Sequence, residues 1–211
     1  MHNWIITEDH KIKELVKIVN LFHDRGLCPA TSTNFSFRLT EDKDLFVISQ
    51  SGVDKSEFQA EHLMVINNNA ESVYDPHLKP SAETFIHIAI YELFPHINAV
   101  LHTHSLNATY LSMNAEKNSL MFENLELLKG LEGNVTHEMS ESLPIFPNSQ
   151  DIKSLSEVIK KYLSENPKTH GLILKGHGLY TWGKDLKTAK RHVETFEYLF
   201  QYKMLEQSKN A

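Results

Sequence analysis

The chain has 211 residues, of which 41% are hydrophobic and 23% are charged, and its formal net charge is −6. This length predicts a single domain over residues 1–211, and the composition excludes a disordered or collagen-like chain. The 27 acidic residues outnumber the 21 basic ones, and lysines and arginines nowhere cluster with aromatic residues, which argues against a nucleic-acid partner.

The N-terminal region predicts an amphipathic helix and no targeting signal. MHNWIITEDHK lacks the basic-then-apolar order of a signal peptide, and the chain has no run of about 18 apolar residues that could span a membrane. Thr7 is the predicted N-cap and Gly26 the predicted stop, and the buried face is formed by Ile12, Leu15, Val16, Val19 and Phe22. Cys28 is the only cysteine and cannot form an internal disulfide, so we predict a cytoplasmic protein.

The next segment predicts β-structure. FSFRL (35–39) and LFVIS (45–49) flank the polar loop TEDKD, which is typical of a β-hairpin. TSTN precedes this hairpin and QSG follows it. HLMVIN (62–67) predicts a further strand, and NNNAESVYDPH (67–77) predicts a surface loop.

The middle of the chain predicts helix, then strand, then helix. Ser81 is the predicted cap of a helix that ends near Pro95 and buries Phe85, Ile86, Ala89, Ile90 and Leu93. AVLHTH (99–104) predicts a strand. Residues 105–131 predict helix in several pieces.

The last third predicts two helices around the strands GLILK (171–175) and YTW (180–182). The residues that indicate the helices are Ile152, Leu155, Ile159 and Tyr162, then Ala189, Val193, Phe196 and Phe200. Because helices and strands alternate without a glycine-rich phosphate motif after the first strand, the pattern predicts one α/β sandwich that is not a nucleotide-binding doubly wound sheet.

Two histidines stand two residues apart in AVLHTHS. On a strand such residues share a face, so the imidazoles of His102 and His104 can both reach one ion. The chain has 13 histidines, and about 0.8 such pairs are expected by chance. The alternative is therefore two hydrogen-bonded polar groups at the end of a strand.

A third histidine, His177, lies between two glycines in KGHGLYTWG. Gly176 and Gly178 would let the backbone present one imidazole into a crowded site, although a tight turn with an incidental histidine would use the same residues. Three neutral imidazoles that leave one position open are the ligand set of a catalytic zinc.

Several longer segments resemble the class II aldolase/adducin-head family. They are GLCPATSTNFSFRL, QSGVDKSEF, KPSAETFIHIAIY, AVLHTHS, ELLKGLEG, THE, PIFPNSQDI and HGLILKGHGLYTWG, between Leu15 and Leu199. The resemblance implies a single-domain three-layer α/β/α sandwich with a central mixed, largely antiparallel sheet. It also implies a homotetramer with sites near the subunit interfaces.

The resemblance implies a set of binding residues. His102, His104 and His177 match histidines that hold a divalent metal, usually zinc, with one ion per subunit. The implied phosphate-binding residues are Thr33, Asn34, Ser51, Gly52 and Ser81, with Lys79 as a further source of charge. Such side chains and exposed N–H groups can form an anion nest, although ordinary turns use the same residue types.

Two carboxylates compete for the proton-transfer role. Glu126 matches the glutamate that acts as general acid/base in the dehydratases of the family, and Glu83 matches the catalytic glutamate of its aldolases. Each also fits a structural role, Glu83 in the first turn of a helix and Glu126 on a solvated helix face. We predict Glu126 as the catalyst and Glu83 as a second-sphere residue.

The segments most similar to the dehydratases of the family are ELLKGL, THE and GHGLYTWG. This similarity implies a zinc-dependent lyase that removes water from 5-methylthioribulose 1-phosphate in methionine salvage. A sugar-phosphate aldolase or epimerase is the alternative, because the family's three reactions share one metal-stabilised enediolate. A non-catalytic module like the adducin heads is a further alternative, although those lack the histidine set. Candidates for an apolar pocket around the methylthio group, each also a candidate core residue, are Met113, Met121, Phe122 and Phe146.

Overall fold

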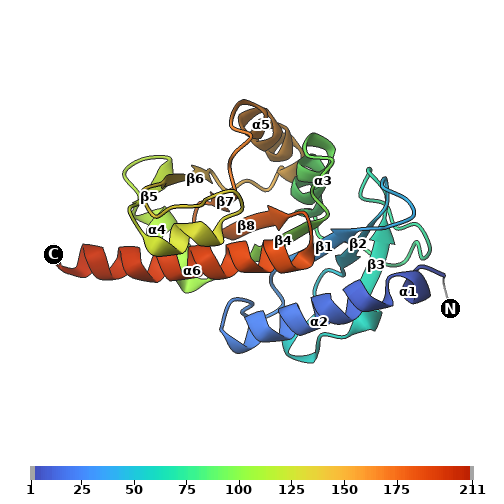
Figure 1. Cartoon of the computed structure of the whole chain (residues 1–211). Helices are drawn as coiled ribbons and strands as arrows, with labels where there is room; N and C mark the ends of the chain where they lie inside the picture. Colours follow the sequence, from blue (N-terminus) through green and yellow to red (C-terminus); the bar gives the residue numbers. More distant parts are fainter. Residues whose placement is uncertain (1–2, 210–211) are drawn as a thin grey trace.

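An eight-stranded sheet with helices on both faces forms the framework of the protein (Figure 1). The computed structural model describes residues 3–209. The strands are β1 Asn34–Arg38, β2 Phe46–Ser49, β3 Leu63–Ile66, β4 Ala99–Thr103, β5 Ser119–Glu123, β6 Ser140–Phe146, β7 Gly171–Leu174 and β8 Gly178–Gly183. The helices are α1 Asn3–Thr7, α2 Asp9–Asp24, α3 Thr84–Leu93, α4 Leu106–Met113, α5 Ile152–Glu165 and α6 Leu186–Lys209, with short 3-10 helices η1 Lys55–Glu57, η2 Ala60–His62 and η3 Glu126–Gly130.

The sheet is mixed but largely antiparallel, as the sequence predicted. Its strand order is β3-β2-β1-β4-β8-β7-β6-β5, and only β6 and β7 pair in parallel. The central strand β4 lies between β1 and β8, where His102 is opposite Asn34 on one side and Tyr180 on the other. This register places residues from distant parts of the chain beside the first of the predicted metal ligands.

Helices cover the two faces of the sheet in two separate layers. Along β4, Val100 packs in the core that contains residues of α3 and α5, whereas Ala99 and Leu101 pack in the core that contains residues of α2 and α6. Helix α4 joins the second layer, because its buried residues share a third cluster with the middle of α6. Figure 1 shows α3 and α5 on one side of the sheet and α2, α4 and α6 on the other. The predicted three-layer α/β/α sandwich is therefore confirmed.

The predicted N-terminal helix corresponds to α2, which begins at Asp9, slightly later than predicted, and stops where predicted. Thr7 is the last residue of α1, and Glu8 occupies the N-cap position of α2 without a side-chain capping bond, so Thr7 is not its cap. The Glu8 carboxylate instead accepts from the backbone N–H of Thr40 at 2.6 Å, which ties the helix to the hairpin loop. Gly26 ends the turn after α2 with φ +71°, a left-handed conformation that glycine adopts easily.

Helix α3 begins at Thr84, three residues after its predicted cap. The Ser81 hydroxyl accepts a hydrogen bond from the Glu83 N–H at 3.3 Å, so it stabilises the turn before the helix. The apolar face predicted for this helix packs in the α3/α5 core, since Ile86 and Ile90 are fully buried and Phe85 and Leu93 pack against them.

Two strands were not predicted. Residues 119–123, expected to be helical, form β5, while α4 and η3 on either side of it are helical. Residues 140–144 of β6 pair with β5, and Pro144 lies opposite Ser119. A short apolar run does not separate strand from helix by periodicity, and a proline argues against a strand interior, so both signals pointed away from this pair.

None of the helices within residues 3–209 combines the length and the apolar character needed to cross a membrane.

Candidate metal centre

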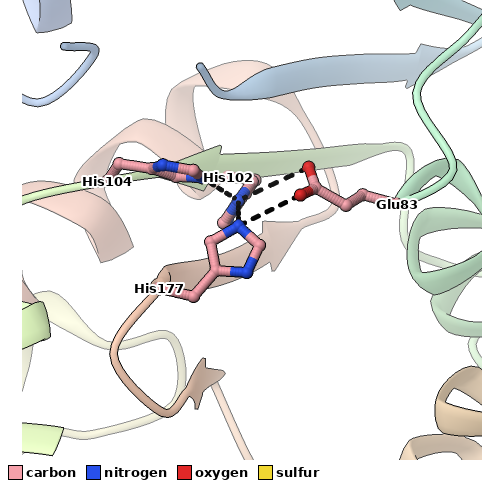
Figure 2. Close-up of side chains that lie close together, drawn as sticks. All are labelled: Glu83, His102, His104 and His177. Atoms are coloured by element: carbon pink, nitrogen blue, oxygen red, sulfur yellow. Dashed lines mark hydrogen bonds and ion pairs between the residues drawn. The ribbon is translucent and has the colours of Figure 1, made fainter. Parts of the chain in front are cut away.

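Four side chains from separate parts of the chain converge at the end of β4 (Figure 2). Glu83 precedes α3, His102 belongs to β4, His104 follows it, and His177 lies in the turn between β7 and β8. Each offers one ligand atom, and these four atoms all lie within 4.8 Å of one another. The structure thus brings together the three histidines that the sequence singled out and adds Glu83 to them.

The histidines face one another through their Nε2 atoms. His102 Nε2 lies 2.7 Å from His104 Nε2 and 3.3 Å from His177 Nε2. A tetrahedral zinc site with bonds of about 2.0–2.1 Å places its ligand atoms about 3.3 Å apart. The spacing in this cluster therefore fits a small divalent cation, with the pair of His102 and His104 somewhat tighter than that ideal.

The second ring nitrogens explain why the Nε2 atoms face inward. His102 Nδ1 lies 3.0 Å from the Leu179 carbonyl, which can only accept, so Nδ1 donates and Nε2 keeps its lone pair. His177 Nδ1 donates to Asn148 Oδ1 at 3.2 Å in the same way. Such outer contacts orient metal-ligating histidines in proteins generally.

Burial keeps the imidazoles neutral. His102 is fully buried, and this burial, reinforced by the neighbouring His104, holds its pKa well below the ordinary value. Burial and the nearby His177 lower the pKa of His104 to about 4. Both rings are therefore unprotonated at neutral pH, the state in which imidazole binds a metal.

Glu83 supplies a negative charge to the cluster. Its Oε1 lies 3.0 Å from His177 Nε2 and its Oε2 lies 3.7 Å from His102 Nε2, while Asn34 Nδ2 donates to Oε2 at 2.5 Å. Burial alone would raise the pKa of Glu83, but the side-chain contact with His177 and the electrostatic interaction with the three imidazoles outweigh burial and lower the pKa to about 2. The contact with His177 is compatible with the predicted second-sphere role of Glu83, and the carboxylate is also close enough to the three histidines to count as a fourth candidate ligand.

Glycines flank His177 for two different reasons. Gly176 has φ +68°, a backbone conformation that side chains disfavour. A Cβ at Gly178 would lie 2.1 Å from the Thr103 carbonyl oxygen, so β8 can approach β4 this closely only without a side chain. The GHG motif therefore permits both the turn and the close packing that bring His177 to His102.

A cavity of about 570 Å³ opens beside the cluster. His104 and His177 line it together with Pro29, Leu106, Thr109 and Asn148. A cavity of this size can admit a small phosphorylated sugar.

The predicted phosphate-binding segments lie next to one another. The Ser51 N–H donates to the Lys79 carbonyl at 3.3 Å, which joins the QSG loop to the KPSAE segment. Asn34, next to Thr33, bonds to Glu83 and thereby joins TSTN to the same segment. Gly52 has φ +77°, a left-handed conformation that glycine adopts easily in a tight turn. The arrangement is compatible with one anion site beside the metal cluster.

Glu126 is not a member of the cluster. It begins η3, its side chain is 71% exposed, and it pairs with Lys129 and, at 3.9 Å, with His137. The hydrogen bond from Lys129 lowers the pKa of Glu126. Within this chain its described contacts are thus to neighbours in its own loop.

The four apolar pocket candidates separate into two kinds. Phe122 and Phe146 are buried in core clusters, whereas Met113 and Met121 are exposed. Met113 lies against Gly176, since a Cβ built there would be 2.8 Å from its sulfur. Of the four, Met113 is therefore placed directly beside the loop that carries His177.

Sequence analysis missed Lys55. Its side chain is fully buried, and its Nζ donates to the Val53 carbonyl at 2.8 Å. Burial lowers the pKa of this ammonium. The only available signal was its place in QSGVDKSEF, because a lysine beside an aspartate and a serine otherwise indicates an exposed loop.

Comparisons with known proteins show the family of this chain. The family profile described as Class II Aldolase and Adducin N-terminal domain matches residues 13–204. The chain is 44% identical over 199 residues to a methylthioribulose-1-phosphate dehydratase of Picosynechococcus sp., covering 93% of this chain and 92% of that protein. It is 40% identical over 188 residues to the protein of the same name from Pseudomonas syringae pv. syringae, covering 89% of this chain and 91% of the other.

Solved structures of similar fold include two sugar-phosphate enzymes. The L-fuculose-1-phosphate aldolase of Thermus thermophilus has a TM-score of 0.74 at 20% identity, covering 96% of this chain and 98% of the other. A sugar-phosphate aldolase from Thermotoga maritima has a TM-score of 0.73 at 18% identity, covering 96% and 97%. At these identities the likeness shows the fold. The profile match and the close relatives go further, and the chain belongs to the class II aldolase and adducin N-terminal domain family.

Proposed function

We propose that this protein is a metal-dependent lyase that converts 5-methylthioribulose 1-phosphate into 5-methylthio-2,3-dioxopentyl phosphate, a step of methionine salvage. The observation that carries this proposal is the identity of 39–44% to proteins named methylthioribulose-1-phosphate dehydratase over about nine-tenths of the chain. The cluster of three histidines and a glutamate beside a cavity supports it, because dehydration next to a ketone needs a group that stabilises negative charge.

We assign the metal site to His102, His104 and His177, with Glu83 as the fourth group and zinc as the ion, one per subunit. The neutral imidazoles of His102 and His104 and the ionised carboxylate of Glu83 fit this ion by charge, and the spacing of the four groups fits it as well. When bound, the ion supplies Lewis-acid polarisation of the substrate carbonyl and offsets the charge that forms as a proton leaves. The Glu83 carboxylate lowers the net positive charge of the metal site by one unit. The hydrogen bond from Asn34 fixes the orientation of this carboxylate.

The reaction breaks two bonds of the substrate. A proton leaves C3, which is acidic because it adjoins the C2 carbonyl, and the C4 hydroxyl then departs as water. One carboxylate can take the C3 proton and return it to the departing hydroxyl. The resulting enol becomes the 2,3-diketone by moving a proton from oxygen to carbon.

Glu126 is our candidate for this proton transfer. In the single chain its side chain is exposed and lies outside the cluster, so in this proposal it serves the metal centre of a neighbouring subunit in a homotetramer. Its salt bridge to Lys129 favours the ionised form that a base needs.

The two ends of the substrate need different surroundings. We assign the phosphate to Thr33, Asn34, Ser51, Gly52 and Ser81, whose segments contact one another beside Glu83. We assign the methylthio group to the side of the cavity near Met113 and Leu106, two exposed apolar side chains of α4.

Product analysis tests the proposed reaction. Zinc-loaded protein incubated with 5-methylthioribulose 1-phosphate should release the diketone phosphate and one water, detected by mass spectrometry. His177→Ala is the control and should abolish turnover by removing one ligand. Release of a triose phosphate would instead mean cleavage of the C3–C4 bond and would overturn the assignment as a dehydratase.

An aldolase is the second candidate, favoured by the position of Glu83. This residue lies in the cluster itself and matches the catalytic glutamate of the family's aldolases. Glu126→Gln and Glu83→Gln separate the two candidates. If the protein is a dehydratase that uses Glu126, Glu126→Gln should lose turnover but keep its zinc. Glu83→Gln should instead lose zinc affinity.

Metal content tests the remaining alternative, a non-catalytic module. The enzyme should bind about one zinc per chain, and the absence of bound metal after reconstitution would favour the module. The cytoplasmic location and the single domain over residues 1–211 stay predictions.

A further inference from the structure

A row of polar contacts connects α3 with β1 behind the metal cluster. Residues four apart on a helix share a face, and residues two apart on a strand do so as well. Hydrogen bonds join these two faces. We call this row the polar ladder, and its members are Asn34, Ser36 and Arg38 on β1, and Glu83, His87 and Tyr91 on or just before α3.

Ser36 and His87 form the centre of the polar ladder. The Ser36 hydroxyl lies 2.7 Å from His87 Nδ1 and 2.8 Å from the Tyr91 hydroxyl. Arg38 Nη2 donates to the Tyr91 carbonyl at 2.7 Å, which completes the row at the far end. At the near end, Asn34 donates to the Glu83 carboxylate.

The polar ladder is buried in an otherwise apolar core. Ser36, His87 and Tyr91 are each 1% exposed and lie beside the cluster of isoleucines that packs α3 onto the sheet. Buried polar networks contribute little to stability compared with apolar packing, but their hydrogen bonds fix the relative placement of the elements that they join. The polar ladder therefore sets the position of the N-terminal end of α3, where Glu83 meets the histidines.

His87 also reaches the histidine side of the cluster. Its ring packs edge-on against Tyr180, with centroids 5.8 Å apart and an interplanar angle of 79°. Tyr180 in turn stacks on His102, with centroids 3.8 Å apart and an angle of 12°. One buried imidazole is thus connected to Glu83 through the helix and to His102 through a single aromatic ring.

We propose that His87 is a positioning residue of the metal centre, which holds the Glu83 carboxylate and the His102 ring in the relative placement that the ion requires. It acts through its Nδ1 contact with Ser36, and its ring packs against Tyr180. The inference depends on the four-group metal site but not on which substrate the protein uses.

Metal affinity of His87 variants tests this role without any substrate. His87→Leu should weaken zinc binding about tenfold or more, as loss of outer contacts does at other metal sites, and should change the visible absorption spectrum of the cobalt(II)-substituted protein. His87→Asn retains a polar atom near the position of Nδ1 and should restore affinity to within about threefold of the parent. His87→Gln places its polar atom near Nε2, which has no hydrogen-bond partner among the described residues, and should not restore it.

His192→Leu is the matched control. His192 is also a buried histidine, 2% exposed, whose Nδ1 donates to the Trp182 carbonyl at 2.8 Å near the opposite end of β8. Its loss should lower the melting temperature but leave zinc affinity and the cobalt spectrum unchanged. The control therefore separates a local effect on the metal centre from general destabilisation.

Ser36→Ala provides a second test if His87→Leu does not fold, because it removes the hydroxyl at the centre of the polar ladder with little change in volume. Like His87→Leu, this substitution should weaken zinc binding. The proposal would be overturned if either folded variant had the zinc affinity and the cobalt spectrum of the parent. It would also be overturned if His87→Asn and His87→Gln restored zinc affinity equally. A failed dehydration assay would not, since these measurements need no substrate.

Discussion

A buried ammonium such as Lys55 is costly unless negative groups offset its charge. Its Nζ donates to the Val53 carbonyl and lies 5.9 Å from the Phe58 ring centroid, and no ion pair links it to a carboxylate of residues 3–209. The carbonyl that it contacts belongs to the loop of Ser51 and Gly52, which we assign to the substrate phosphate. The charge is therefore well placed to attract an anion in a protein whose net charge of −6 would repel one.

Replacement of Lys55 by methionine should separate stability from substrate binding. Lys55→Met keeps the aliphatic volume and removes the buried charge, so the free energy of unfolding should rise by about 1 kcal/mol. The KM for the phosphorylated substrate should rise about tenfold, which corresponds to a lost interaction of about 1.4 kcal/mol. Thermal melts and steady-state kinetics measure the two effects.

Lys79→Met is the control for this prediction, because Lys79 is an exposed residue near the same loop. Solvent screens its charge, so its removal should change KM less than the removal of Lys55. A KM for Lys55→Met within twofold of the parent would exclude Lys55 from phosphate binding.

At the scale of elements, amphipathic periodicity predicted most of the fold. The hairpin of β1 and β2, the strands β4, β7 and β8, and the helices α2, α3, α5 and α6 follow the apolar spacing of the sequence. The pair of β5 and β6 does not, because β5 is short and β6 contains Pro144. Its pairing depends on contacts between residues about 20 apart, which local patterns do not report.

The site was predictable only in part for the same reason. The spacing of His102 and His104 was sufficient to suggest a shared ion, and the structure brings both into one cluster, with His102 in β4 and His104 just after it. Glu83 joins them because the packing of α3 and the bond from Asn34 bring it there, and both depend on tertiary contacts. Lys55 was missed because burial of a lysine is decided by packing that its neighbours in sequence do not indicate.

Helices α4 and α6 meet at a buried carboxyl group that titrates near neutral pH. Glu197 of α6 is 7% exposed and lies by Ser105 and Asn107 at the start of α4. Burial raises the pKa of Glu197 to about 7, although the side chains of Ser105 and Asn107 oppose this. Since the pKa is higher in the folded state than in the unfolded state, this group stabilises the fold fully below about pH 4.5, and its contribution is lost as the pH rises through 7.

Glu197→Gln should therefore stabilise the protein at pH 8 but not at pH 4.5. The amide is neutral at both values and removes the cost of burying a charge, which is about 3 kcal/mol for a shift of this size. Urea denaturation at the two pH values measures the difference. Equal stabilisation at both would mean that Glu197 is already protonated at pH 8, and destabilisation at pH 8 would mean that its charge is paired.

At the scale of the whole molecule, Glu126 is not part of the metal cluster of its own chain. The cluster lies at the end of β4, whereas Glu126 is an exposed residue of η3, in the long connection between β5 and β6. A base that does not reach the metal centre of its own chain would act on no substrate there. Closed rings of identical subunits solve this problem, because the surface of one copy faces the metal centre of the next.

Mixed oligomers should reveal this arrangement. His177→Ala removes a metal ligand and Glu126→Gln removes the base, so each variant alone should be inactive. In a tetramer assembled at random from equal amounts of the two, about a quarter of the sites combine an intact metal centre with an intact Glu126 from the neighbour. Co-expression should therefore restore about a quarter of the parent activity, measured as diketone formation per subunit. Zero activity in mixed oligomers that contain both variants would mean that Glu126 acts within its own chain. Full activity of Glu126→Gln alone would assign the proton transfer to another group, and Glu83 is the carboxylate already present in the cluster.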